Sequence, residues 1–140
     1  MALQASELKV GDTHSEVVVD NLSRTQIVMY AGASGDYNPV HSDEVFVTKV
    51  AGYPTVFAHG MLSMGLTGKM LTNYVGDGRL KHYGVRFTSQ VWPGDTLTAT
   101  AEVTAVRTDD AGDQVVDLEI TTTNQDGVAV IKGSAIARVD

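Results

Sequence analysis

The chain has 140 residues, a formal net charge of −7 and no cysteine. This length suits one domain with a sizeable apolar core, so we expect residues 1–140 to form a single domain. The absence of cysteine excludes zinc–thiolate sites, disulfides and cysteine nucleophiles, and the acidic balance argues against binding to a nucleic-acid backbone.

The N-terminal residues contain no basic region followed by a long apolar run, so we expect no secretory signal and a cytoplasmic location. The longest apolar segment, residues 60–75, contains Lys69 and several glycines and is short for a membrane span. We therefore expect a protein that does not act in a membrane.

The N-terminal third predicts a short strand over residues 16–19 and then a helix that starts at Arg24. Ser23 is a good N-cap, and Gln26 stands three residues later, as in a capping box. We expect this helix to end within residues 32–35, where glycines favour termination.

A second short helix is predicted over residues 43–50 and a long one over residues 60–75. Apolar side chains occur around most of the long helix, which indicates burial inside the domain. Each glycine inside it costs roughly 1 kcal/mol relative to alanine. We expect close packing to explain Gly65 and Gly68, whereas packing and close approach of a ligand are the two explanations for Gly60.

After residue 78 the pattern becomes β. Four strands are predicted, separated by turns rich in glycine and aspartate: residues 79–91, 96–107, 114–123 and 128–139. Leu97, Ala99 and Ala101 alternate with polar or small residues, which indicates a strand with one buried face. One strand, helices and four antiparallel strands predict an α+β domain.

The loop of residues 35–41 contains the candidate chemistry. Asp36, Asn38 and His41 place an acid, an amide and an imidazole around Pro39, which restricts the residue before it to extended geometry. We expect a turn followed by extended chain. A carboxylate and an imidazole suit general acid and base work near neutral pH. Ordinary turn chemistry is the main alternative, and a metal loop fits poorly because oxygen ligands are missing at the required positions.

Two motifs in this order resemble the signature of the MaoC-like (R)-specific hydratases and dehydratases. They are residues 30–41 and the tetrapeptide of residues 58–61, and the resemblance continues through residues 83–87 and 92–95. It implies a hotdog fold, in which a curved antiparallel sheet wraps around a long central helix. It also implies hydration of trans-2-enoyl thioesters to (R)-3-hydroxyacyl thioesters, or the reverse dehydration, with no metal and no cofactor.

The resemblance implies that Asp36 and His41 form the catalytic dyad. Asn38 orients the loop or the water, and the Gly60 amide polarises the thioester carbonyl. For Gly60, the resemblance therefore favours the ligand explanation. We expect Asp36 to activate the water and His41 to deliver the proton to C2, with sharing of the two roles through one water as the alternative. Some family members place a serine where Gly68 stands, so a serine role is not carried over to this chain.

Side chains near the two motifs are candidates for binding the acyl group: Tyr37, Tyr53, Phe57 and Ser63. Core packing is the alternative for the aromatic residues, and a polar contact on the helix face is the alternative for Ser63. His59 is interpreted as a structural capping residue rather than a catalyst.

Two other functions compete with hydration. One is thioester hydrolysis by a hotdog thioesterase, and the other is acyl binding by a subunit without catalysis. Many such thioesterases have an Asp or Glu on the long helix, and residues 60–75 have none. The intact Asp36, Asn38 and His41 argue against a non-catalytic subunit.

The expected partners are the substrate carrier and a second subunit. Acyl-CoA and acyl carrier protein are both open as carriers. A homodimer is expected, and the resemblance to the catalytic subunits of actinobacterial fatty-acyl dehydratases leaves open a heterodimer with a related hotdog subunit. A local basic cluster, formed by Arg79, Lys81, His82 and Arg86, is expected to be a solvated strand face, with contact to carrier phosphates as the alternative.

Overall fold

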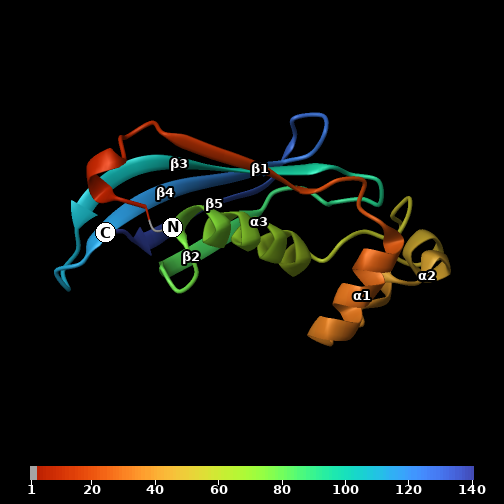
Figure 1. Ribbon diagram of the computed structural model, residues 1–140. Helices are drawn as coiled ribbons and strands as arrows, with labels where there is room; N and C mark the ends of the chain where they lie inside the picture. Colours follow the sequence, from red (N-terminus) through yellow and green to blue (C-terminus); the bar gives the residue numbers. More distant parts are fainter. Residues whose placement is uncertain (1–2) are drawn as a thin grey trace.

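A computed structural model describes residues 3–140, in which five antiparallel strands form one sheet in the order β1-β3-β4-β5-β2. The strands are β1 (Thr13–Val19), β2 (Leu80–Phe87), β3 (Leu97–Thr108), β4 (Gln114–Thr123) and β5 (Ala129–Arg138). Figure 1 shows the sheet curving over the long helix α3 (Gly60–Val75), with α1 (Arg24–Ser34) and α2 (Glu44–Lys49) together at one end. This arrangement confirms the predicted α+β class and hotdog fold.

The core lies between the concave face of the sheet and α3. Ala101 of β3 pairs with Ile120 of β4, and both side chains are fully buried. They belong to one apolar cluster with Leu71 and Val75 of α3. The predicted buried face of β3 is confirmed, and its small side chains let the sheet approach the helix.

Helix α1 begins and ends where the sequence predicts. The Ser23 hydroxyl accepts a hydrogen bond from the Gln26 amide at 3.0 Å, and the helix starts at the next residue after Ser23. Gly35 ends it with a φ of 74°, a left-handed conformation that favours glycine. Asp36 follows directly, so the candidate loop is anchored on a helix terminus.

Two strand boundaries differ from the prediction by more than one residue. Strand β1 begins earlier, because Thr13, His14 and Ser15 also pair with β3. Strand β2 ends at Phe87 rather than at residue 91, because the chain leaves the ladder after Thr88, whose amide still donates to the Val130 carbonyl at 3.0 Å. The departing segment forms a wall of the pocket described below.

The candidate loop is more compact than predicted. Asn38 has φ −56° and ψ 123°, as expected before a proline, but Pro39–His41 forms a 3-10 helix instead of extended chain. The Asn38 side-chain oxygen accepts the Val40 amide at 3.2 Å, and Pro39 occupies a first-turn position where its missing N–H costs nothing. The predicted extended chain was wrong because proline fixes its own φ at a value that also suits a helical turn and disfavours helical geometry only in the residue before it.

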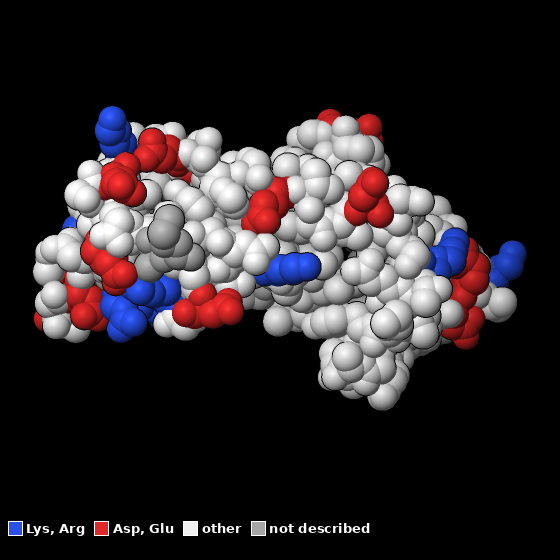
Figure 2. Space-filling model, in the orientation of Figure 1, with Lys and Arg blue, Asp and Glu red and all other residues white. Residues whose placement is uncertain are grey.

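Charged side chains of both signs are interspersed on the face shown in Figure 2. The predicted basic cluster is largely neutralised: Arg79 binds Asp140 at 3.0 Å, and Lys81 binds Asp113 at 2.8 Å and also Asp109. These ion pairs favour a solvated strand face over a binding site for carrier phosphates.

No helix within residues 3–140 combines the length and the apolar character needed to cross a membrane.

Candidate functional site

His41 ends the short 3-10 helix and is 8% exposed. Its Nδ1 lies 2.6 Å from the main-chain oxygen of Phe57. A carbonyl oxygen only accepts hydrogen bonds, so Nδ1 must donate, and the neutral ring has its lone pair on Nε2. The Phe57 ring also meets the imidazole edge to face, with centroids 5.3 Å apart. His41 therefore has a fixed tautomer with Nε2 able to take up a proton.

Asp36 is exposed at the start of the same loop. Its Oδ1 accepts the Asn38 amide at 3.2 Å, and its own amide donates to the Ser34 hydroxyl at 3.2 Å. The Asn38 side chain in turn caps the following 3-10 helix. These local bonds fix the course of the loop, which is consistent with the loop-orienting role expected for Asn38.

Asp36, His41 and His59 meet in space, each offering an atom within 4.8 Å of the other two. The His41 and His59 rings stack with centroids 3.8 Å apart and planes inclined by 24°. An imidazole lone pair lies in the ring plane, so two stacked rings cannot both aim at one ion. The cluster therefore suits acid–base chemistry better than metal binding.

His59 occupies the N-cap position of α3 and is 2% exposed. Its Nε2 donates to the main-chain oxygen of Asp36 at 3.1 Å. Among residues 3–140, its side chain caps no amide of the helix and its buried Nδ1 has no hydrogen-bond partner. The predicted capping role is therefore wrong, because the ring turns back to the loop. Burial lowers the pKa of His59 and the nearby His41 lowers it further, which keeps the ring neutral.

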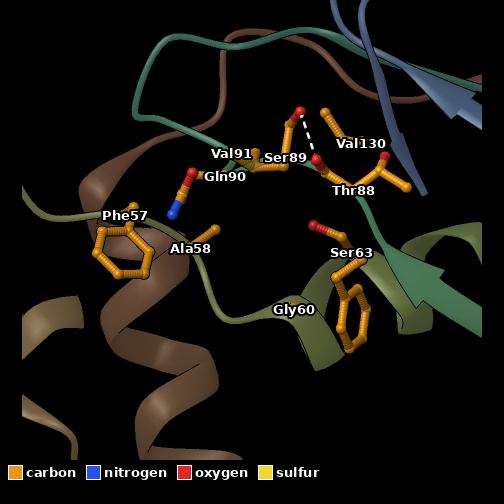
Figure 3. Close-up of a pocket in the computed structure, with 10 residues that line it drawn as sticks. Phe57, Ala58, Gly60, Ser63, Thr88, Ser89, Gln90, Val91 and Val130 are labelled. Carbon is orange, nitrogen blue, oxygen red and sulfur yellow. Dashed lines mark hydrogen bonds between the residues drawn. The ribbon is translucent and has the colours of Figure 1, made fainter.

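A pocket of about 300 Å³ opens beside the start of α3 (Figure 3). One wall is formed by residues 57, 58, 60 and 63, and the other by residues 87–91 and Val130. Figure 3 shows the Ser63 hydroxyl pointing into this space from α3. Phe57, Gly60 and Ser63, all expected site residues, therefore line one cavity.

The other expected residues are not part of the wall of this pocket. Tyr37 is 71% exposed, and Tyr53 packs edge to face on Phe57 with ring centroids 4.9 Å apart. Within residues 3–140, Asp36 and His41 do not line the pocket either. Phe57 joins the two parts, because its carbonyl binds His41 while the residue lines the pocket.

The glycines of α3 have different surroundings. A Cβ on Gly60 would lie 2.9 Å from the Phe87 ring, so packing against this ring favours glycine here. A Cβ on Gly68 would lie 3.3 Å from the Tyr83 ring, in agreement with the predicted close packing. At Gly65 it would meet nothing within 4 Å among the described residues, so the packing prediction is wrong there.

The fold and the loop define the class as a hotdog domain with an acid–imidazole pair beside its long helix. Residues 6–126 match the family described as the MaoC like domain, and the chain belongs to this family.

Named proteins resemble the chain in sequence and in structure. It is 36% identical over 90 residues to 3-hydroxyacyl-thioester dehydratase Y of Mycobacterium tuberculosis, which covers 62% of the chain and 31% of that protein. It is 34% identical over 102 residues to the (R)-specific enoyl-CoA hydratase of Rhodospirillum rubrum, with 71% and 69% covered. The unliganded R-hydratase PhaJ1 of Pseudomonas aeruginosa superposes with a TM-score of 0.85 at 27% identity, covering 99% of this chain and 86% of that one. The chain thus spans less than a third of the first of these relatives.

Proposed function

We propose that the protein is a hydro-lyase that adds water to trans-2-enoyl thioesters to give (R)-3-hydroxyacyl thioesters, or catalyses the reverse dehydration, in fatty-acyl metabolism in the cytoplasm. The observation that carries the proposal is the convergence of the Asp36 carboxylate and the imidazole of His41, whose Nε2 is free to exchange a proton because Nδ1 is held by the Phe57 carbonyl. Addition of water needs one group to take a proton and another to give one. The names of the hydratase and dehydratase relatives support the same reaction.

In the proposed hydration, Asp36 accepts a proton from water as the water oxygen bonds to C3. His41, protonated at Nε2, gives its proton to C2, and the Phe57 carbonyl stabilises the cationic ring by accepting from Nδ1. A proton then passes from Asp36 to His41, which restores both groups. The short separation within the cluster permits this transfer through one water.

Negative charge develops on the thioester oxygen when C3 is attacked. We assign its stabilisation to the Gly60 amide, because the first amides of a helix have no partner within the helix and lie at the positive end of its dipole. The pocket beside Gly60 then receives the acyl group between Phe57 and Ser63. Tyr53 supports this wall through Phe57, whereas the exposed Tyr37 joins it only if a second subunit covers it.

A dimer is part of the proposal. Strand β2 is an edge of the sheet, and an uncovered edge strand is a pairing site. Met61 and Phe87, close to the pocket, are 56% and 49% exposed. Two-fold pairing would cover these apolar side chains. The partner is an identical chain or a related hotdog subunit, and the carrier is CoA or acyl carrier protein.

The experiment is a turnover assay of purified protein with trans-2-enoyl-CoA substrates of graded length, with and without EDTA. We expect loss of the enoyl absorbance, appearance of the 3-hydroxyacyl-CoA and no effect of the chelator. Acyl carrier protein substrates run in parallel identify the preferred carrier. Release of free thiol without hydration would establish a thioesterase, and binding without turnover would establish an acyl-binding subunit.

A further inference from the structure

His59 joins three separate segments of the chain. Its ring stacks on His41, its Nε2 binds the main chain of Asp36, and the Tyr30 ring of α1 meets it at a centroid distance of 4.8 Å and an angle of 66°. It also directly precedes Gly60. The loop, α1 and the start of α3 are therefore held against one imidazole.

The polarity of His59 is costly for folding. Its Nδ1 is buried and has no hydrogen-bond partner in residues 3–140. A buried polar atom without a hydrogen-bond partner destabilises the fold, whereas an apolar side chain would fill the space without leaving such an atom. A residue that served packing alone would not need an imidazole here, so the nitrogen atoms indicate a further task.

The two stacked histidines differ in where a second proton can go. A proton added to His41 goes to Nε2, and Nδ1 already has the Phe57 carbonyl as acceptor. A proton added to His59 would go to the buried Nδ1, which has no acceptor among the described residues. Two charged rings at 3.8 Å would also repel each other. The charge is therefore directed to His41, while the carboxylate of Asp36 is the only anionic group of the cluster within residues 3–140.

We propose that His59 is a positioning residue for the Asp36–His41 pair: it holds the Asp36 main chain and the plane of the His41 ring, and it stays uncharged so that the exchanged proton resides on His41. The kinetic part rests on the proposed hydratase function. The structural part does not, because the tautomer of His41 can be measured without turnover.

The first experiment compares His59→Leu, which lacks the donor, with His59→Gln, whose amide nitrogen can reach the position of Nε2. Nitrogen-15 NMR of the histidine rings reports tautomer and titration. We expect His41 to be an Nδ1–H tautomer in the wild type and in His59→Gln. In His59→Leu we expect a mixture of tautomers, because the His41 ring is no longer held in the plane that directs Nδ1 to the Phe57 carbonyl. His14→Gln, at a histidine of β1 that contacts Glu16, is the control and should leave His41 unchanged.

The second experiment measures kcat and KM of the same variants. We expect His59→Leu to lower kcat by about ten- to a hundredfold with KM within about threefold, because displaced catalytic groups lose rate rather than binding. His59→Gln should keep kcat within about threefold of the wild type. If His59→Leu does not fold, His59→Asn replaces it, since its amide is too short for the contact.

The outcomes separate the two proposals. A wild-type His41 tautomer and kcat in His59→Leu would overturn the positioning role, and so would equal losses in His59→Leu and His59→Gln. A wild type that hydrates no enoyl thioester would overturn the proposed function, yet the tautomer comparison would still decide whether His59 fixes His41.

Discussion

The Nδ1 of His41 lies 2.6 Å from the main-chain oxygen of Phe57, and this contact couples the acid–base pair to the pocket. It fixes which imidazole nitrogen exchanges a proton, because the carbonyl can only accept. The same residue, Phe57, lines the cavity beside Gly60. A displacement of the main chain at Phe57 would therefore disturb both the proposed proton transfer and the proposed acyl binding.

Removal of either dyad member should abolish most activity. We expect Asp36→Asn and His41→Ala each to lower kcat by about 10²–10⁴, the usual contribution of one acid or base. The double variant should lose less than the product of the two factors, since the groups act as a unit. Circular dichroism checks folding. Near-normal kcat in either folded variant would place the chemistry elsewhere.

Gly60→Ala tests the helix start against a matched position. The new methyl group would lie 2.9 Å from the half-exposed Phe87 ring, which can turn outward, so we expect a folded protein with kcat lowered at least about tenfold by misplacement at the pocket. Gly65→Ala is the control, since its methyl group meets nothing within 4 Å among the described residues. It should keep kcat and gain up to about 1 kcal/mol of stability. Equal kcat values in the two variants would show that the space beside residue 60 is not needed for turnover, since alanine keeps the backbone amide.

Gly133→Ala tests the tight contact between β5 and β2. A Cβ there would fall on the Gly84 carbonyl and lie 2.8 Å from the Val85 Cα, and backbone atoms cannot rotate away. We expect a loss of about 3 kcal/mol in unfolding free energy, measured in urea. Ser134→Ala, an exposed neighbour, should change it by less than about 0.5 kcal/mol. Similar stability of the two variants would argue against this close approach.

The lowered pKa of His59 predicts a pH dependence of stability. The unfolded chain has the ordinary value of 6.5 and the folded chain a lower one, so the unfolded state binds the proton first as pH falls. Stability therefore declines below about pH 6.5, through the interval between the two values. His59→Gln lacks this group and should lose less stability between about pH 7.5 and pH 5.5 than the wild type in parallel urea titrations. Identical losses would show that His59 is not a buried neutral group.

Much of the fold could be predicted from local sequence signals. The Ser23 cap and the left-handed Gly35 define α1, and both depend on adjacent residues. Apolar side chains around most of residues 60–75 predicted the bounds of α3. The end of β2 could not be predicted in this way, because the chain leaves the sheet where Thr88 binds Val130, a distant residue.

The sequence predicts the candidate site residues, but it does not predict the contacts between them. Asp36 and His41 lie on one short loop, so their proximity follows from sequence. The contact from His59 to Asp36 spans 23 residues and depends on how α3 packs against the loop. A histidine directly before Gly60 was the available signal, and local rules assigned it to capping. The position of the pocket relative to Asp36 and His41 also depends on tertiary packing.

The most direct test of the account is the stereochemistry of the product. Purified protein is incubated with a trans-2-enoyl-CoA substrate, the product is hydrolysed and its hydroxyl configuration is determined by chiral chromatography, with His41→Ala protein as the control for background hydration. The account predicts the (R)-3-hydroxyacyl product with the wild type and almost none with the control. Exclusive formation of the (S) product, or release of free thiol without hydration, would contradict it.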